Sequence, residues 1–67
     1  MQIKAIEAFE TIRISKGFSK RSLARAMGVN QSVVSSIEAG HAVRPATAKK
    51  AVHALEEPFD KLFIIED

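Results

Sequence analysis

The sequence contains no cysteine and only three glycines and two prolines among its 67 residues. Without thiols the chain can form neither a disulfide framework nor a thiolate metal site, which fits a reducing compartment. No apolar run is long enough to cross a bilayer, and the N-terminus lacks the pattern of a secretory signal peptide. We therefore expect residues 1–67 to form one soluble cytoplasmic domain with no membrane partner.

The residues of catalysis are equally scarce. The two histidines, His41 and His53, have no plausible acid or nucleophile partner in the sequence, and no glycine-rich phosphate loop is present. Two distant histidines are more often surface or packing residues than metal ligands. We expect a protein that is not an enzyme and that needs neither a metal nor a cofactor.

Charge is unevenly distributed along the chain, although the net charge is only +2. Between residues 13 and 50 the only acid is Glu38, whereas residues 51–67 carry one cation, Lys61, among five acids. The basic residues of the middle segment are Arg13, Lys16, Lys20, Arg21, Arg25, Arg44, Lys49 and Lys50. This asymmetry favours one face for a polyanion and another turned away from it, although small soluble domains also carry uneven charge by chance.

The apolar pattern has a helical period and predicts five short helices. We expect the first three at residues 2–16, 20–27 and 31–39. The fourth has Pro45 in its first turn, with Ala48, Ala51, Val52 and Leu55 on its inner face, and the fifth begins at Pro58. Gly17, Gly28 and Gly40 fall where the first three should end. No segment shows the period of two that is typical of a sheet, so the predicted fold class is all-α.

Two of these helices flank a tight turn at Gly28. Ser19 is suited to cap the earlier one by accepting from the backbone N–H of Arg21 or Ser22, and Asn30 can cap the later one. A steep crossing needs a small residue such as Ala24 at the contact and a glycine in the left-handed conformation at the turn. The apolar residues that would hold this pair are Leu23, Met27, Val29, Val34 and Ile37.

The segment "IRISKGFSKRSLARAMGVNQSVVSSIEAG", with "RP" four residues after Gly40, resembles the lambdoid phage repressor and Cro family, also called the XRE family. The resemblance covers nearly the whole chain. It implies a five-helix lambda-repressor-like DNA-binding domain with a helix-turn-helix at residues 20–38. It also implies a structural ion pair between Arg13 and Glu38.

The resemblance further implies which residues contact DNA. Its base-contacting positions are Gln31, Ser32, Val33 and Ser36, whose side-chain types can reach major-groove edges. Its phosphate-contacting positions are Ser19, Lys20, Arg21, Asn30, His41 and Arg44. Lys20 departs from the glutamine that the family usually places there, so it keeps a phosphate contact but cannot brace Gln31 as a glutamine would. The alternative is that Asn30, Gln31 and Ser32 only cap and solubilise a helix start.

The C-terminal segment "PFDKLFIIED" carries more apolar side chains than a small monomer can readily bury. We expect residues 58–65 to form a homodimer contact through Phe59, Phe63 and Ile64, although Phe59 and Leu62 could instead complete the chain's own core. The predicted function is a small phage or mobile-element repressor that binds a pseudo-palindromic double-stranded DNA operator as a dimer. The alternative is an interaction module of the same fold, a modulator or antitoxin that grips a protein partner through this apolar tail.

Overall fold

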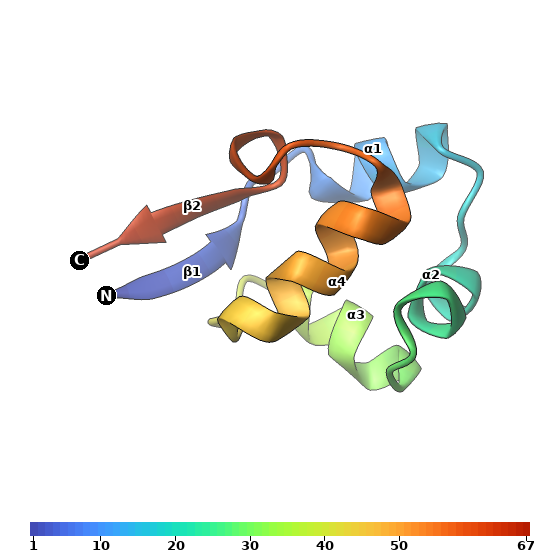
Figure 1. Ribbon diagram of the computed structural model, residues 1–67, viewed down its shortest axis with the longest axis horizontal. Helices are drawn as coiled ribbons and strands as arrows, with labels where there is room; N and C mark the ends of the chain where they lie inside the picture. Colours follow the sequence, from blue (N-terminus) through green and yellow to red (C-terminus); the bar gives the residue numbers. More distant parts are fainter.

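The computed structural model describes all residues, 1–67. A helical body carries a projecting two-stranded sheet, in which the first and last strands of the chain lie antiparallel like the arms of a hairpin (Figure 1). The elements in chain order are β1 (Gln2–Ala5), α1 (Phe9–Ser15), α2 (Lys20–Met27), α3 (Gln31–Glu38), α4 (Pro45–Leu55), a 3₁₀ turn η1 (Phe59–Lys61) and β2 (Phe63–Glu66). None of the helices combines the length and apolar character that spanning a bilayer requires.

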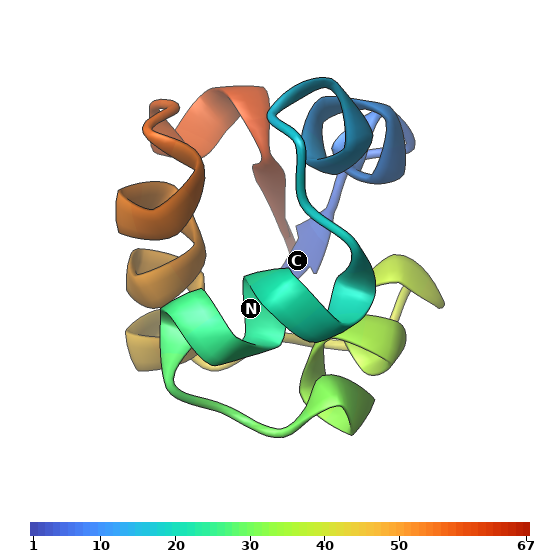
Figure 2. The same ribbon diagram turned by 90° about the vertical axis from the view of Figure 1, so that its right-hand side faces the viewer.

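The core lies between the helices and the base of the hairpin. Its buried members include most of the residues that the helical pattern selected, such as Leu23 and Val34, neither of which exposes any surface. The full set is Phe9, Leu23, Ala24, Met27, Val34, Ile37, Val43, Ala48, Ala51, Leu55, Leu62 and Phe63. In Figure 2 α2 and α3 lie next to each other on the lower side of the molecule, and the two strands lie behind the helices.

The single helix predicted over residues 2–16 is wrong in its first half. Residues Gln2–Ala5 form β1, and α1 begins only at Phe9. Ile3 and Ala5 are two residues apart, so in a strand both side chains point to the same face, where they pack against the core. The sequence did not distinguish a strand from a helix here, because four residues are too few to tell a period of two from the helical period.

The fifth helix predicted from Pro58 is also wrong. Residues Phe59–Lys61 form one 3₁₀ turn, after which Phe63–Glu66 run as β2 antiparallel to β1, with Ile3 opposite Ile65. Adjacent β-branched residues, Ile64 and Ile65, favour a strand over a helix. The fold is therefore mostly helical, with four α-helices and a small sheet, rather than all-α with five helices.

The hydrogen bonds of the sheet define its edges. The N–H of Ile6 donates to the carbonyl of Leu62 at 2.9 Å, and on the other side of β1 the N–H of Val43 donates to the carbonyl of Ile3 at 2.7 Å. Strand β1 is therefore bonded on both sides, to β2 and to the segment that connects α3 to α4. Strand β2 has a neighbour on one side only.

An ion pair joins the end of α1 to the segment after α4. Lys16 Nζ lies 2.9 Å from a carboxylate oxygen of Glu57. The hydrogen bond from Lys16, more than its charge or that of Lys61, holds the pKa of the Glu57 carboxyl below its ordinary value of 4.5. A lowered folded-state pKa adds stability that is present above the unfolded-state pKa and is lost as the pH falls through the folded-state pKa.

We therefore expect Glu57→Gln to be less stable than the parent protein at neutral pH and to match it at a pH well below 4.5. Urea unfolding of both proteins across this range measures the gap. Glu7→Gln is the control, because Glu7 forms no ion pair in the structure. A gap of the same size at every pH contradicts the expectation.

Candidate nucleic-acid interface

Helix α2 begins with a reciprocal capping arrangement. The Ser19 hydroxyl accepts from the N–H of Ser22 at 3.0 Å, and the N–H of Ser19 donates to the Ser22 hydroxyl at 2.9 Å. From the sequence, the Ser19 hydroxyl could accept from the backbone N–H of either Arg21 or Ser22. The structure forms the contact with Ser22. Both hydroxyls are thereby used to fix the start of α2, which sets the position of the helix-turn-helix on the body.

Gly28 makes the sharp turn between α2 and α3. Its φ of 72° lies in the left-handed region, and the N–H of Val29 donates a hydrogen bond to the carbonyl of Ala24 at 3.0 Å. A glycine adopts this conformation without the steric cost that a side chain would add. The turn lets Val34 and Ile37 of α3 pack into the core, which leaves the opposite face of α3 in solvent.

The side chains on that face are short and uncharged. Gln31, Ser32 and Ser36 are exposed, and Val33 is half-buried beside them. Asn30 occupies the N-cap position, but its side chain makes no capping hydrogen bond, so its amide is free to contact another molecule. The four base-contacting candidates thus lie on one short helix that presents donors, acceptors and one methyl-bearing side chain.

Arg13 fixes the far end of α3. Its Nε donates to Glu38 Oε2 at 2.5 Å, and its NH1 donates to the carbonyl of Phe18 at 2.8 Å. The two side chains are only 7% and 8% exposed. The structure therefore forms the pair that the resemblance implies and adds a contact that the sequence did not indicate. One guanidinium holds α1, the turn before α2 and the end of α3 together.

Lys20 lies in a hollow beside α3. The residues that line this hollow are Glu7, Phe9, Glu10, Lys20, Ser35, Glu38 and Ala39. Three of them are carboxylates, of which Glu10 and Glu38 form ion pairs with Arg13. Gln31 is not among the residues that line this hollow.

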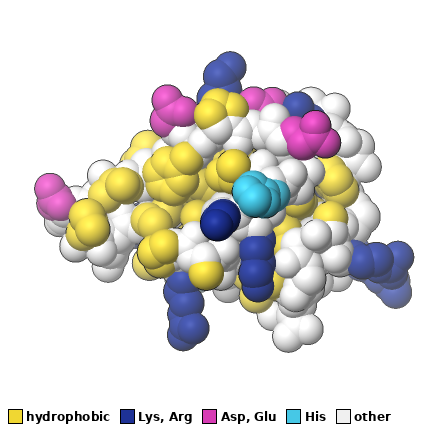
Figure 3. Space-filling view, in the orientation of Figure 1, with side chains coloured by type: hydrophobic (Ala, Val, Ile, Leu, Met, Phe, Trp, Pro, Cys, Tyr) yellow, Lys and Arg dark blue, Asp and Glu magenta, His cyan; other side chains and the backbone are white.

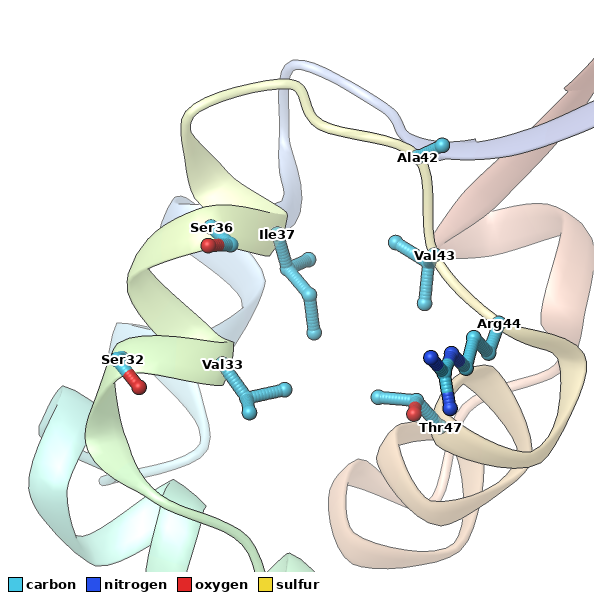
Figure 4. A pocket seen from close by; sticks show the side chains of 8 residues that line it. All are labelled: Ser32, Val33, Ser36, Ile37, Ala42, Val43, Arg44 and Thr47. Atoms are coloured by element: carbon cyan, nitrogen blue, oxygen red, sulfur yellow. The ribbon is translucent and has the colours of Figure 1, made fainter.

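A second hollow lies on the other side of α3, between it and the start of α4. Figure 4 shows Arg44 and Thr47 on one wall, with Ser32 and Val33 on the other. Arg44 is the exposed N-cap of α4, and Pro45 follows it at the first helical position, as expected. Thr47 is absent from the candidates drawn from the sequence. It lies in the first turn of α4, and its side chain points toward α3 (Figure 4).

The remaining charged candidates are exposed. Arg21 lies on α2 and His41 follows the end of α3. In Figure 3 the acidic side chains lie along the top and at the tip of the hairpin, whereas basic side chains lie in the centre, at the lower edge and at the right, with others at the top beside the acidic ones. The lower part of this face is therefore basic, and its top carries both signs of charge.

The three candidates for a dimer contact have different positions. Phe63 is 1% exposed, with its ring centroid 5.7 Å from that of Phe9 and 5.4 Å from that of Phe59. Phe59 is half-buried in the same cluster, whereas Ile64 is 44% exposed. The two phenylalanine rings thus pack within the chain's own core, and Ile64, together with Ile65, is what the tail presents to solvent.

Comparison with known proteins adds one finding to this geometry. The family model described as "Helix-turn-helix" matches residues 9–62. The chain belongs to this helix-turn-helix family. No curated protein and no solved structure gave a significant match.

Membership in the helix-turn-helix family, of the XRE type, identifies a DNA-binding regulator domain. The match begins with α1 and ends at Leu62, after η1. Strands β1 and β2 lie wholly outside the matched segment. The hairpin is therefore a feature that the helix-turn-helix family model does not describe.

Proposed function

We propose that the protein is a sequence-specific transcriptional regulator that inserts α3 into the major groove of double-stranded DNA. The observation that carries this proposal is the face of α3 formed by Gln31, Ser32 and Ser36, exposed on a helix that is held at both ends. The turn at Gly28 holds one end, and the buried pair of Arg13 and Glu38 holds the other. A fixed helix with exposed polar side chains is what reading base edges requires.

Each side chain has a distinct role in this reading. Gln31 makes a bidentate contact with an adenine, the hydroxyls of Ser32 and Ser36 bond base edges or phosphates, and Val33 touches a thymine methyl. Asn30, with its free amide, contacts a phosphate at the groove edge. No acid lies in the first turn of α3 to repel the DNA.

The phosphates on either side of the groove bind at the two hollows that flank α3. Arg44, with the Thr47 hydroxyl beside it, binds the strand on the α4 side, and the N-terminus of α2 with Lys20 and Arg21 binds the other strand. Ser19 contributes through its backbone, because its hydroxyl caps α2, and His41 lies at the margin.

Two copies of the protein bind a pseudo-palindromic operator in this proposal. One domain of this size covers little DNA, so specificity calls for a second recognition helix about 34 Å away along the duplex. Occupying such a site at a promoter blocks transcription, which makes the protein a repressor of the Cro type, carried by a phage or another mobile element. The reaction chemistry of an enzyme has no part in this function.

A second candidate function is that of an interaction module, a modulator or antitoxin of the same fold. The observation that favours it is the pair of exposed isoleucines, Ile64 and Ile65, on the hairpin that the family model leaves out. Selection of bound duplexes from random DNA at two salt concentrations separates the candidates. A palindromic sequence motif supports the regulator, and weak, salt-sensitive binding without a motif supports the module.

The variant Gln31→Ala tests directly whether the Gln31 side chain recognises a base. We expect the variant to lose roughly 1–3 kcal/mol of binding free energy on the selected operator and little on random DNA, because only the operator places an adenine opposite the amide. Titration of both DNAs by fluorescence anisotropy at one salt concentration measures the two losses.

The matched control is Gln2→Ala, which removes an exposed glutamine from β1, away from the proposed interface. It should bind both DNAs as the parent protein does. If Gln31→Ala weakens binding to the operator and to random DNA equally, Gln31 contacts no base.

A further inference from the structure

A shallow groove lies on the face of the sheet that carries Ile3 and Ile65. These two residues are partners in the register of β1 and β2, so their side chains lie on the same face, and Val43 and Pro45 also line the groove. Val43 is buried and Ile3 half-buried, whereas Pro45 and Ile65 are exposed. The volume of the groove is about 350 Å³, at the lower end of the range of ~300–1,000 Å³ that is typical of small-molecule sites.

The charge of the groove has one sign. Gln2 and Arg44 are the only lining residues with polar side chains, so a cation lines the groove and no carboxylate does. Glu66 follows Ile65 in β2 and therefore points to the opposite face of the sheet, where its carboxylate lies 3.4 Å from Lys4. Arg44 forms no ion pair within the chain. An apolar surface with one unpaired guanidinium at its margin suits an anion with an apolar body.

Arg44 lies on the wall between this groove and the hollow beside α3. Residues 42–44 line both of them. In Figure 4 the guanidinium of Arg44 lies on the side of the hollow, near Thr47. Neither an ion pair nor a hydrogen bond to the rest of the chain holds the guanidinium there. Rotation about the side-chain bonds of this exposed residue therefore turns the charge toward either side of the wall.

We propose that the groove binds a small carboxylate with an apolar chain, and that this ligand draws Arg44 away from DNA. The apolar chain packs against Ile3, Val43 and Ile65, and the two carboxylate oxygens accept hydrogen bonds from the Arg44 guanidinium. One guanidinium cannot hold this carboxylate and a phosphate on the α3 side at the same time. The ligand therefore weakens DNA binding, and by linkage DNA weakens ligand binding by the same factor.

The effect on DNA rests on the proposed function, whereas the ligand site does not and is tested without DNA. The probe is octanoate below its micelle-forming concentration. Octylammonium has a similar apolar chain with the opposite charge, and acetate has the carboxylate without the chain. In two-dimensional NMR titrations we expect octanoate to shift the backbone amides of Ile3, Val43, Arg44 and Ile65, with a dissociation constant of about 1 mM or lower. Both control ions should bind at least about tenfold more weakly.

Two pairs of variants locate the ligand. Ile65 on β2 is 56% exposed and Ile14 on α1 is 59% exposed, so Ile65→Ser and Ile14→Ser are matched. We expect Ile65→Ser to raise the dissociation constant of octanoate about fivefold, and Ile14→Ser to leave it unchanged. Arg44→Gln should remove most of the preference for octanoate over octylammonium. Arg25→Gln should keep that preference, because Arg25 is an exposed arginine of α2 outside the groove.

The effect on DNA is measured with a random-sequence duplex, because phosphate contacts do not depend on the sequence. In saturating octanoate we expect the parent protein to bind this duplex about tenfold more weakly than in acetate at the same ionic strength. Arg44→Gln should bind the duplex equally in the two salts. If the parent protein binds no duplex even without octanoate, the proposed function fails and the effect on DNA fails with it, whereas the NMR titrations decide the ligand site separately.

Four outcomes overturn the proposal. The first is equal binding of octanoate and octylammonium, which would mean that the groove does not recognise a carboxylate. The second is equal octanoate affinity in Ile65→Ser and Ile14→Ser, with circular dichroism showing that both variants keep their fold. The third is DNA binding by the parent protein that saturating octanoate leaves unchanged. The fourth is an octanoate affinity that falls as the protein concentration rises, which would assign the groove to a second copy of the chain.

Discussion

Arg13→Ala is expected to destabilise the protein by about 3–5 kcal/mol, because it leaves the Glu38 carboxylate buried without its partner. The Phe18 carbonyl also loses the hydrogen bond that the guanidinium donates. A chain of this size has a total stability of only about 3–10 kcal/mol. We therefore expect a substantial unfolded fraction at 25 °C, measured by urea unfolding followed by circular dichroism.

Two further variants separate the effect of the unpaired buried carboxylate from the effect of lost packing. Arg25→Ala removes an exposed arginine of α2 and should change the unfolding free energy by less than about 0.5 kcal/mol. The double variant Arg13→Leu/Glu38→Leu should recover most of the stability lost in Arg13→Ala, since it removes the unpaired charge as well. If the double variant is no more stable than Arg13→Ala, the loss comes from packing and not from the buried carboxylate.

The helix-turn-helix could be predicted from the sequence because its signals are local. The serine at position 19, the glycine at 28 and the proline at 45 each act through the few residues around them, and each occupies the expected position. The face of α3 followed from the same pattern, because burial of Val34 and Ile37 determines which residues are exposed.

The hairpin could not be predicted in the same way. Strands β1 and β2 lie at opposite ends of the chain, and each has only four residues. Their pairing is non-local, and neither strand is long enough for alternation to stand out from a helical pattern. Thr47 escaped prediction for a related reason, because its position beside Val33 depends on the angle between α3 and α4 and not on any local motif.

Phe63→Ala is the second variant with a large expected effect, about 3–5 kcal/mol. Phe63 is 1% exposed and its ring lies between those of Phe9 on α1 and Phe59 on η1. The substitution removes both ring contacts and opens a cavity at the point where the hairpin joins the helical body. Although residue 63 lies just beyond the segment matched by the helix-turn-helix family model, we expect the helical body to depend on it.

Ile64→Ala is the matched control, since it shortens the neighbouring side chain on the solvent side of the same strand and should cost less than about 1 kcal/mol. Thermal unfolding at equal protein concentrations compares the two variants with the parent protein. A large loss at residue 63 with a small loss at residue 64 assigns the Phe63 ring to the core and the Ile64 side chain to the surface. Similar small losses at both positions would mean that the helical body folds without the two strands.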